Sequence, residues 1–482
     1  MNKLIELLKK LSAVELRWFV EYVKSPFFNK HQNLIKLIEL LYEAAPLYES
    51  KTLDKKNLFK YIFPHEKYKE QKVSDLASYL VDLLENFMAY LNYEKQPVLQ
   101  KQLLLKELRE RELDKFFQSN LRELRKKTDA YSYRDEFYYH NRFLAETESD
   151  AFFIKKGSRE RNDSLQKKVD SLDLFYLSVK LRNSCEMINR QNIISSKYNL
   201  RMLDNIISYL NKHPEELKDV PSITIYHRIL LTLTESENEI HYTRLKELLA
   251  EHARKFSIEE SRQMYDYAQN YCIKKINQGN AFYAKEIFSL YKLLLENEII
   301  FEGKYLSQWD YKNIVSIAIR LKEFEWTKKF MEQYKEKIAA EFRNNAYTYN
   351  LASYYYSKEE YKSALKLLQE VEFTDVFYHL GSKSMLLKMY YELEETEALY
   401  SLIDTFKMYL NRNKLISDYQ QETHYNLVKY TKKVYNFKIN SGNKSSINKT
   451  EIQALKNKIV SAKNISNLQW LIEKIEELWE SK

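Results

Sequence analysis

The chain has 482 residues, of which 44% are hydrophobic and 30% are charged, and its formal net charge is +9. This composition supplies enough apolar residues for a sizeable core and excludes an intrinsically disordered chain. The sequence contains only 5 glycines and 6 prolines, whereas an average protein of this length carries roughly 30 and 25. Sheets and tight turns need more of both residues, so the composition favours helices joined by short connections.

Membrane and secretory segments are not expected. No stretch approaches the roughly 18 apolar residues of a membrane span, and Glu6 and a lysine pair interrupt the first apolar repeat. Cys185 and Cys272 are too few and too far apart for a disulfide framework or a thiolate metal site. We therefore expect a cytoplasmic protein that does not act at a membrane.

Residues 1–96 are predicted to form a separate N-terminal helical unit. Ser12 and Glu15 have the spacing of a capping box, and the apolar residues that follow recur at helical intervals. Four prolines lie between the predicted helices of this unit or just after them: Pro26, Pro46, Pro64 and Pro97. Because proline interrupts a helix, Pro97 marks the predicted boundary.

Residues 97–440 are predicted to continue as helices, and their later part repeats. Ser357 and Glu360 have the spacing of a second capping box, which predicts that one helix ends near Tyr356 and another begins after Ser357. A shift of 34 residues aligns Tyr356 with Tyr390, and a shift of 37 aligns Asn313 with Asn350. The sequence therefore predicts successive helical hairpins, clearest over residues 311–405.

These hairpins resemble tetratricopeptide repeats, which are 34-residue helical hairpins stacked into a superhelix. Small and large residues match the packing positions of that family at Leu351, Ala352, Tyr355, Tyr361, Ala364 and Leu368. The proline that usually closes a unit is missing. The resemblance implies an all-α fold, a TPR-like α-solenoid of stacked helical hairpins that follows the N-terminal helical unit.

The resemblance also implies a concave groove that binds a peptide or a partner helix. By the family's pattern, six side chains should face that groove: Tyr349, Ser353, Tyr356, Lys383, Leu387 and Tyr390. Rigid aromatic side chains are favoured anchors at interfaces. For most of the tyrosines, packing between neighbouring hairpins is the better explanation, because a large ring fills a thin core while its hydroxyl reaches the rim.

A basic segment near the C-terminus gives an alternative function. Nine lysines and one acid lie between Lys429 and Lys463, and lysines interleaved with aromatic residues can contact phosphates and stack bases. The candidate nucleic-acid-binding residues are Lys429, Lys432, Lys433, Lys438 and Lys444. A solvated helix followed by a surface loop explains the same segment. Residues 441–482 are predicted to form this basic loop and two C-terminal capping helices.

Catalytic signatures do not occur in the sequence. The nine histidines form no metal-binding motif, and no nucleophile elbow or phosphate-binding glycine loop is present. An enzyme would need a pocket that holds acid or base groups with shifted pKa values, and no motif in the sequence indicates such a pocket. We therefore expect no metal, no cofactor and no catalytic residues, and interpret the chain as a non-catalytic scaffold for protein–protein interaction.

Overall fold

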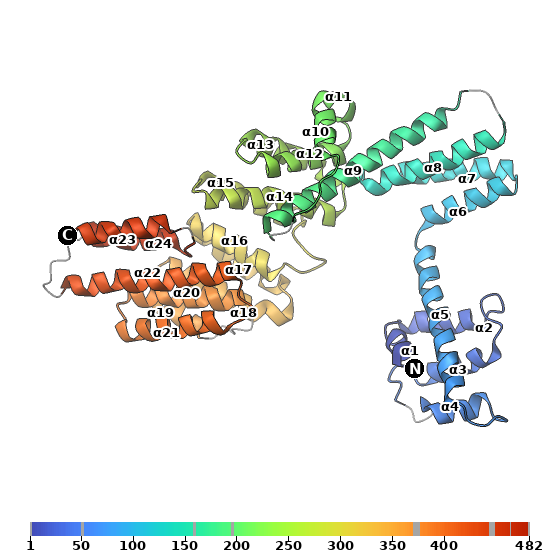
Figure 1. The fold of residues 1–482 in the computed structure, drawn as a ribbon, viewed down its shortest axis with the longest axis horizontal. Coiled ribbons are helices and arrows are strands. Elements are labelled where there is room, and N and C mark those ends of the chain that lie inside the picture. The colour runs from blue at the N-terminus through green and yellow to red at the C-terminus, as the bar shows by residue number, and fades with distance from the viewer. Residues whose placement is uncertain are drawn as a thin grey trace. The chain divides into compact units, whose positions relative to one another are not determined.

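The computed structural model describes residues 2–49, 53–157, 161–193, 197–369, 376–442, 449–462 and 464–480. These residues form 24 α-helices and no β-strand (Figure 1), which confirms the predicted all-α class. The chain divides into two compact units, Met1–Thr224 and Ile225–Lys482, and each is described by itself. The boundaries predicted from the sequence, after residues 96 and 440, stay predictions.

The first unit begins with five helices that share one hydrophobic cluster. They are α1 (Asn2–Leu8), α2 (Ala13–Lys24), α3 (Gln32–Glu43), α4 (Lys55–Ile62) and α5 (Glu70–Glu94). Phe19 and Phe87 lie in this cluster with ring centroids 5.3 Å apart. The capping box predicted at the start of α2 is confirmed, because Ser12 Oγ accepts from Glu15 N at 3.2 Å and Glu15 Oε2 accepts from Ser12 N at 2.8 Å.

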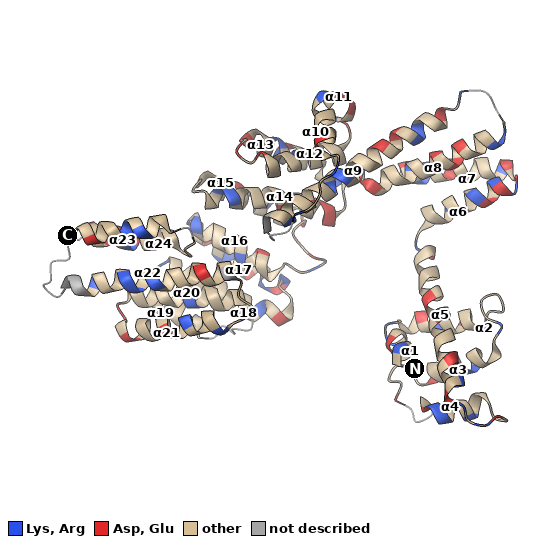
Figure 2. Cartoon of the chain, in the orientation of Figure 1, with Lys and Arg blue, Asp and Glu red and all other residues tan. Residues whose placement is uncertain are grey.

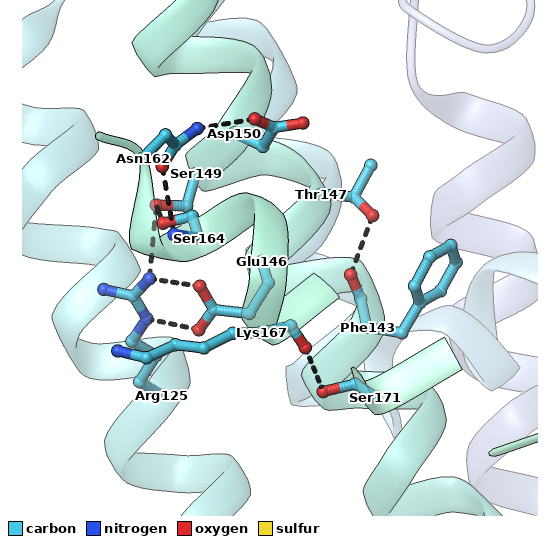
Figure 3. Close-up of polar contacts among 10 residues, drawn as sticks. All are labelled: Arg125, Phe143, Glu146, Thr147, Ser149, Asp150, Asn162, Ser164, Lys167 and Ser171. Atoms are coloured by element: carbon cyan, nitrogen blue, oxygen red, sulfur yellow. Dashed lines mark hydrogen bonds and ion pairs between the residues drawn. The ribbon is translucent and has the colours of Figure 1, made fainter. Parts of the chain in front are cut away.

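Further helices follow in the first unit, and polar side chains help to join them. The helices are α6 (Pro97–Glu110), α7 (Asp114–Asp129), α8 (Glu136–Lys155), α9 (Asp163–Ile193), α10 (Leu203–Lys212) and α11 (Pro214–Leu217), and α12 (Pro221–Thr234) begins in the first unit and continues into the second. Arg125 of α7 donates two hydrogen bonds to Glu146 of α8, at 2.9 and 2.6 Å, and Ser149 of α8 shares one with Ser164 of α9 at 2.7 Å (Figure 3). Glu146 is only 6% exposed, so this ion pair is part of the packing between the helices.

The second unit is a succession of helices that pair with their neighbours in the chain. They are α13 (Glu239–His252), α14 (Ile258–Asn277), α15 (Phe282–Glu296), α16 (Gln308–Arg320), α17 (Phe324–Tyr334), α18 (Ala340–Ser357), α19 (Tyr361–Leu368), α20 (Val376–Glu392), α21 (Thr396–Arg412), α22 (Asp418–Gly442), α23 (Lys449–Ser461) and α24 (Leu468–Glu480). Helix α16 packs on α17, α18 on α19, and α20 on α21; in addition, α18 contacts both α16 and α20.

Three of these pairs are joined by the same three-residue turn. The middle residue has a left-handed backbone with φ of 60° at Lys322, 61° at Glu359 and 58° at Glu394. The next residue donates its N–H five residues back, at 2.9 to 3.0 Å, in the bonds Glu323 to Ala318, Glu360 to Tyr355 and Glu395 to Tyr390. This is a Schellman-type helix end. The turns recur after 37 and then 35 residues, counted from Lys322 to Glu359 and from Glu359 to Glu394.

The capping box predicted at Ser357 and Glu360 is wrong. Ser357 is the last residue of α18, and Glu360 precedes α19 without a side-chain hydrogen bond to the helix. The break between the two helices lies where the sequence predicts it, but the left-handed turn at Glu359 makes it, and the Ser357 side chain does not.

Candidate functional site

Helices α18 and α20 lie side by side and run in the same direction. Tyr349 of α18 is so close to Gly381 of α20 that a Cβ atom on the glycine would lie 2.3 Å from the tyrosine Oη. Seven residues further along each helix, Lys388 Nζ lies 4.6 Å from the centre of the Tyr356 ring. Both pairs are 32 residues apart in the sequence, so the absence of a side chain at Gly381 sets how closely the helices approach.

Two of the six residues predicted to face the groove are in the interior. Tyr349 is 7% exposed and packs edge-on against Tyr378, with ring centroids 5.0 Å apart, and Leu387 is fully buried. The prediction that these two side chains offer binding surface is wrong. The other four, Ser353, Tyr356, Lys383 and Tyr390, are half-buried, and Ser353 Oγ donates to the backbone oxygen of Tyr349 at 3.1 Å.

A one-residue error in register accounts for the buried position of Leu387, one of the three residues predicted on α20. The turns on either side of α20 are 35 residues apart, between Glu359 and Glu394, whereas the sequence alignment used a shift of 34. With a shift of 35, the equivalents of Tyr349, Ser353 and Tyr356 on α20 are Ser384, Lys388 and Tyr391. Of these three residues, Lys388 is half-buried, whereas Ser384 and Tyr391 are 5% and 2% exposed.

The C-terminal helix α24 contacts α20 at Glu392, a residue that the sequence analysis missed. Trp470 Nε1 donates to Glu392 Oε1 at 2.8 Å, and Lys474 Nζ lies 3.0 Å from the same oxygen. The Trp470 ring also packs edge-on against Tyr391, with centroids 5.2 Å apart. The Lys474 and Glu392 side chains are only 12% and 15% exposed. Removing either partner would leave the other charge unpaired in a site that is shielded from water.

Burial and neighbouring carboxylates shift the pKa values of two lysines around this contact. Desolvation lowers the pKa of Lys388 to about 8, although Glu392 and Glu473 oppose the shift. Its Nζ also donates to Asn467 Oδ1, at the start of α24, at 3.1 Å. Desolvation also disfavours the charged form of Lys474, but hydrogen bonds to Glu477 and Glu392 outweigh it and raise the pKa of this lysine.

We call Tyr356, Lys388, Tyr391 and Glu392 the α18–α20 face. It combines two aromatic rings, an ammonium group and a carboxylate. Such a set can accept an indole N–H and a cation from a neighbouring helix, as it does from α24. No signal in the sequence connects Glu392 with Trp470, because the two are 78 residues apart.

The lysines of the predicted nucleic-acid-binding segment point to different neighbours. On α22, Lys429 and Lys433 are exposed, whereas Lys432 lies over the Tyr400 ring, and Lys438 pairs with Glu394 at 2.9 Å. These lysines are among the blue residues of α22 in Figure 2. Lys444 lies outside the described residues. The structure thus spreads these charges and partly neutralises them, and nucleic-acid binding stays a prediction.

Two carboxyl groups with raised pKa values lie elsewhere in the second unit. Burial raises the pKa of Asp266 on α14 and of Asp310 on α16 to about 6, and the nearby Asp266 carboxylate raises the pKa of Asp310 further. Arg262 on α14, which lowers both values, lines an open cleft of about 720 Å³ together with Glu302. Asp266 itself is exposed and Asp310 half-buried, so water screens part of this effect.

Replacing Asp310 with asparagine is expected to stabilise the protein in a pH-dependent way. The pKa is raised from 3.8 to about 6 in the folded state, so this carboxyl contributes a penalty that is absent at pH 4, grows between pH 4 and 6 and is complete above pH 6. After screening, and after loss of a favourable charge in the first turn of α16, we expect a gain of about 1 kcal/mol at pH 7. Urea denaturation at pH 4.5 and 7 measures the gain in the free energy of unfolding. An equal gain at both pH values would contradict a raised pKa at Asp310.

Neither a metal site nor a membrane-spanning helix occurs among the described residues. Across the described part of the chain, no group of three or more His, Cys, Asp or Glu side chains is placed to hold a metal ion. None of the described helices combines the length and apolar character needed to cross a bilayer. Comparisons with protein-family models, with curated proteins and with solved structures found no match.

Proposed function

We propose that the chain is a non-catalytic scaffold for protein–protein interaction, and that the α18–α20 face binds a helix of its partner. In this proposal the second unit is a TPR-like α-solenoid, and the protein works in the cytoplasm. The observation that carries it is the contact at Glu392, where Trp470 and Lys474 of α24 meet one carboxylate. A face that holds one helix through specific polar contacts has the chemistry needed to hold another.

The repeated turns support the solenoid. Equivalent left-handed residues at Lys322, Glu359 and Glu394, with parallel contacts between α18 and α20, are what stacked helical hairpins require. A rigid array of this kind presents preformed side chains, so the scaffold loses little conformational entropy when a partner binds.

Charge reversal at Glu392 tests the proposal. Glu392→Lys is expected to reduce capture of partner proteins from the source cells by at least about tenfold, because a lysine repels the cation that the carboxylate attracts. Glu397→Lys is the matched control, since it makes the same charge change at an exposed position of α21. Quantitative affinity capture compares the two variants with the unchanged chain. Equal retention by all three, with matching helical content, would contradict the proposed face.

A further inference from the structure

Helix α9 of the first unit packs against α8 and turns a stripe of apolar side chains to solvent on another side. The stripe consists of Leu165, Val169, Leu172 and Tyr176, which are between 40% and 49% exposed. A contiguous row of exposed apolar side chains marks a surface that packs against another molecule. We propose that this stripe is a dimerisation surface, and that α9 of a second copy of the chain packs on it in parallel and in register. This inference goes beyond the proposed function and does not depend on it.

The spacing of the stripe is that of a coiled-coil seam. Its successive members are four, three and four residues apart, which is the heptad pattern in which positions a and d face a partner helix. Leu165 and Leu172 occupy d positions, and Val169 and Tyr176 occupy a positions. A β-branched residue at a with leucine at d favours a parallel pair of helices.

The stripe is short, but the helix that carries it is already folded. Isolated coiled-coil peptides need roughly three or four heptads, because each helix must form as the strands associate. Helix α9 is 31 residues long and is held by its packing against α8, so association does not have to form it. Tyr176 Oη also donates to Met202 Sδ at 3.6 Å, and Met202 is 60% exposed, which extends the apolar surface. A surface of this size lies at the low end of specific interfaces, so we expect a Kd on the order of 10 μM.

Charged side chains beside the stripe make it complementary to a second copy of itself. Lys168 occupies a g position on one side of the stripe, and Asp173 occupies an e position on the other. In a parallel pair, position g of one helix faces position e of the next heptad of the other helix, so Lys168 of each copy meets Asp173 of the second copy. In an antiparallel pair, e positions face each other, and Asp173 meets the neutral Gln166 instead. The two ion pairs therefore favour the parallel arrangement.

Lys168 can serve this contact although it already has a partner. Its Nζ lies 2.6 Å from Asp150 Oδ2 on α8, and its side chain remains 25% exposed. An ammonium group has three donors, so it can bind a carboxylate of the second copy as well.

Cysteine cross-linking of the full-length chain tests the arrangement. In a parallel pair in register, each a position faces itself, so Val169→Cys is expected to give a disulfide-linked dimer on mild oxidation with copper phenanthroline. Lys167→Cys is the matched control, because residue 167 is exposed but lies about 200° around the helix from residue 169, and it should stay monomeric. The two native cysteines, Cys185 and Cys272, are buried. Non-reducing electrophoresis compares the two chains.

Sedimentation equilibrium tests the association without a cross-link. Leu172→Glu is expected to raise the Kd of the dimer at least about tenfold, because it places two like charges face to face in the seam, whereas Lys167→Glu should leave the Kd unchanged. Asp173→Lys is expected to raise the Kd about fivefold, since Lys168 then meets a lysine. In an antiparallel pair this change would have little effect.

Three results would overturn the inference. The first is equal cross-linking of the Val169→Cys and Lys167→Cys chains. The second is a disulfide that forms only in a mixture of Val169→Cys and Leu172→Cys chains, because that linkage shows an antiparallel pair. The third is an unchanged chain that sediments as a monomer up to about 200 μM.

These tests remain decisive if one variant folds poorly. Should Leu172→Glu lose helical content, Leu172→Ser takes its place with an expected rise in Kd of about threefold, and no rise there also overturns the inference. Every one of these outcomes leaves the proposed function standing, because capture of partners by the Glu392→Lys chain tests that function separately.

Discussion

Gly381→Ala is expected to lower the free energy of unfolding by about 2–3 kcal/mol, although alanine is the better helix former by about 1 kcal/mol. The added Cβ would lie 2.3 Å from Tyr349 Oη and 3.1 Å from Cζ of the same ring. Tyr349 is only 7% exposed, so its ring cannot move aside without disturbing α18. Urea denaturation followed by circular dichroism measures the loss.

The companion variant Tyr349→Phe separates this clash from a general effect on α20. Removing the hydroxyl deletes the nearest atom and leaves the ring carbon at 3.1 Å, so the double variant should recover about half of the loss. A Gly381→Ala chain as stable as the unchanged chain would contradict the close approach of α18 and α20.

Glu392→Ala is expected to cost about 2–3 kcal/mol in the free energy of unfolding. It leaves the Lys474 ammonium and the Trp470 N–H without an acceptor that both use at present, and an uncompensated charge in a site only 12% exposed is strongly destabilising. The hydrogen bond from Lys474 to Glu477 remains, which keeps the expected loss below that of a fully buried pair.

Glu394→Ala is the matched control for that prediction. Glu394 pairs with Lys438 at 2.9 Å, but its side chain is 67% exposed, so its removal should cost less than about 1 kcal/mol. The urea concentrations at the midpoints of unfolding show directly which of the two variants loses more stability. If the two losses were equal, the Glu392 contact would be no more than an ordinary surface ion pair.

Much of the fold follows from local chemistry that the sequence displays. Scarce glycine and proline predict the all-α class, the capping box at Ser12 and Glu15 predicts the start of α2, and the repeated pattern predicts a break between α18 and α19. These features depend on residues a few positions apart. Short-range hydrogen bonding and helical periodicity therefore determine them.

The details of the candidate site depend on longer-range packing. The register of α20 is fixed by turns that place Glu359 and Glu394 35 residues apart, and a shift of 34 selects Leu387, which is fully buried, in place of Lys388, which is half-buried. Glu392 acquires its role only when α24 folds against α20. In the first unit, the pairing of Arg125 with Glu146 is likewise a contact between helices that no local pattern indicates.

Site-specific photo-crosslinking tests the central claim, that the α18–α20 face binds a partner helix, most directly. A benzoylphenylalanine is introduced in place of Tyr356, which is half-buried on α18 and belongs to the face, and, as a control, in place of Tyr425, which is 40% exposed on α22. We predict a covalent adduct with a protein partner at position 356 that an excess of a peptide of residues 464–480 suppresses, and no such adduct at position 425. Adducts at neither position, or equal adducts at both that the peptide leaves unchanged, would contradict the claim.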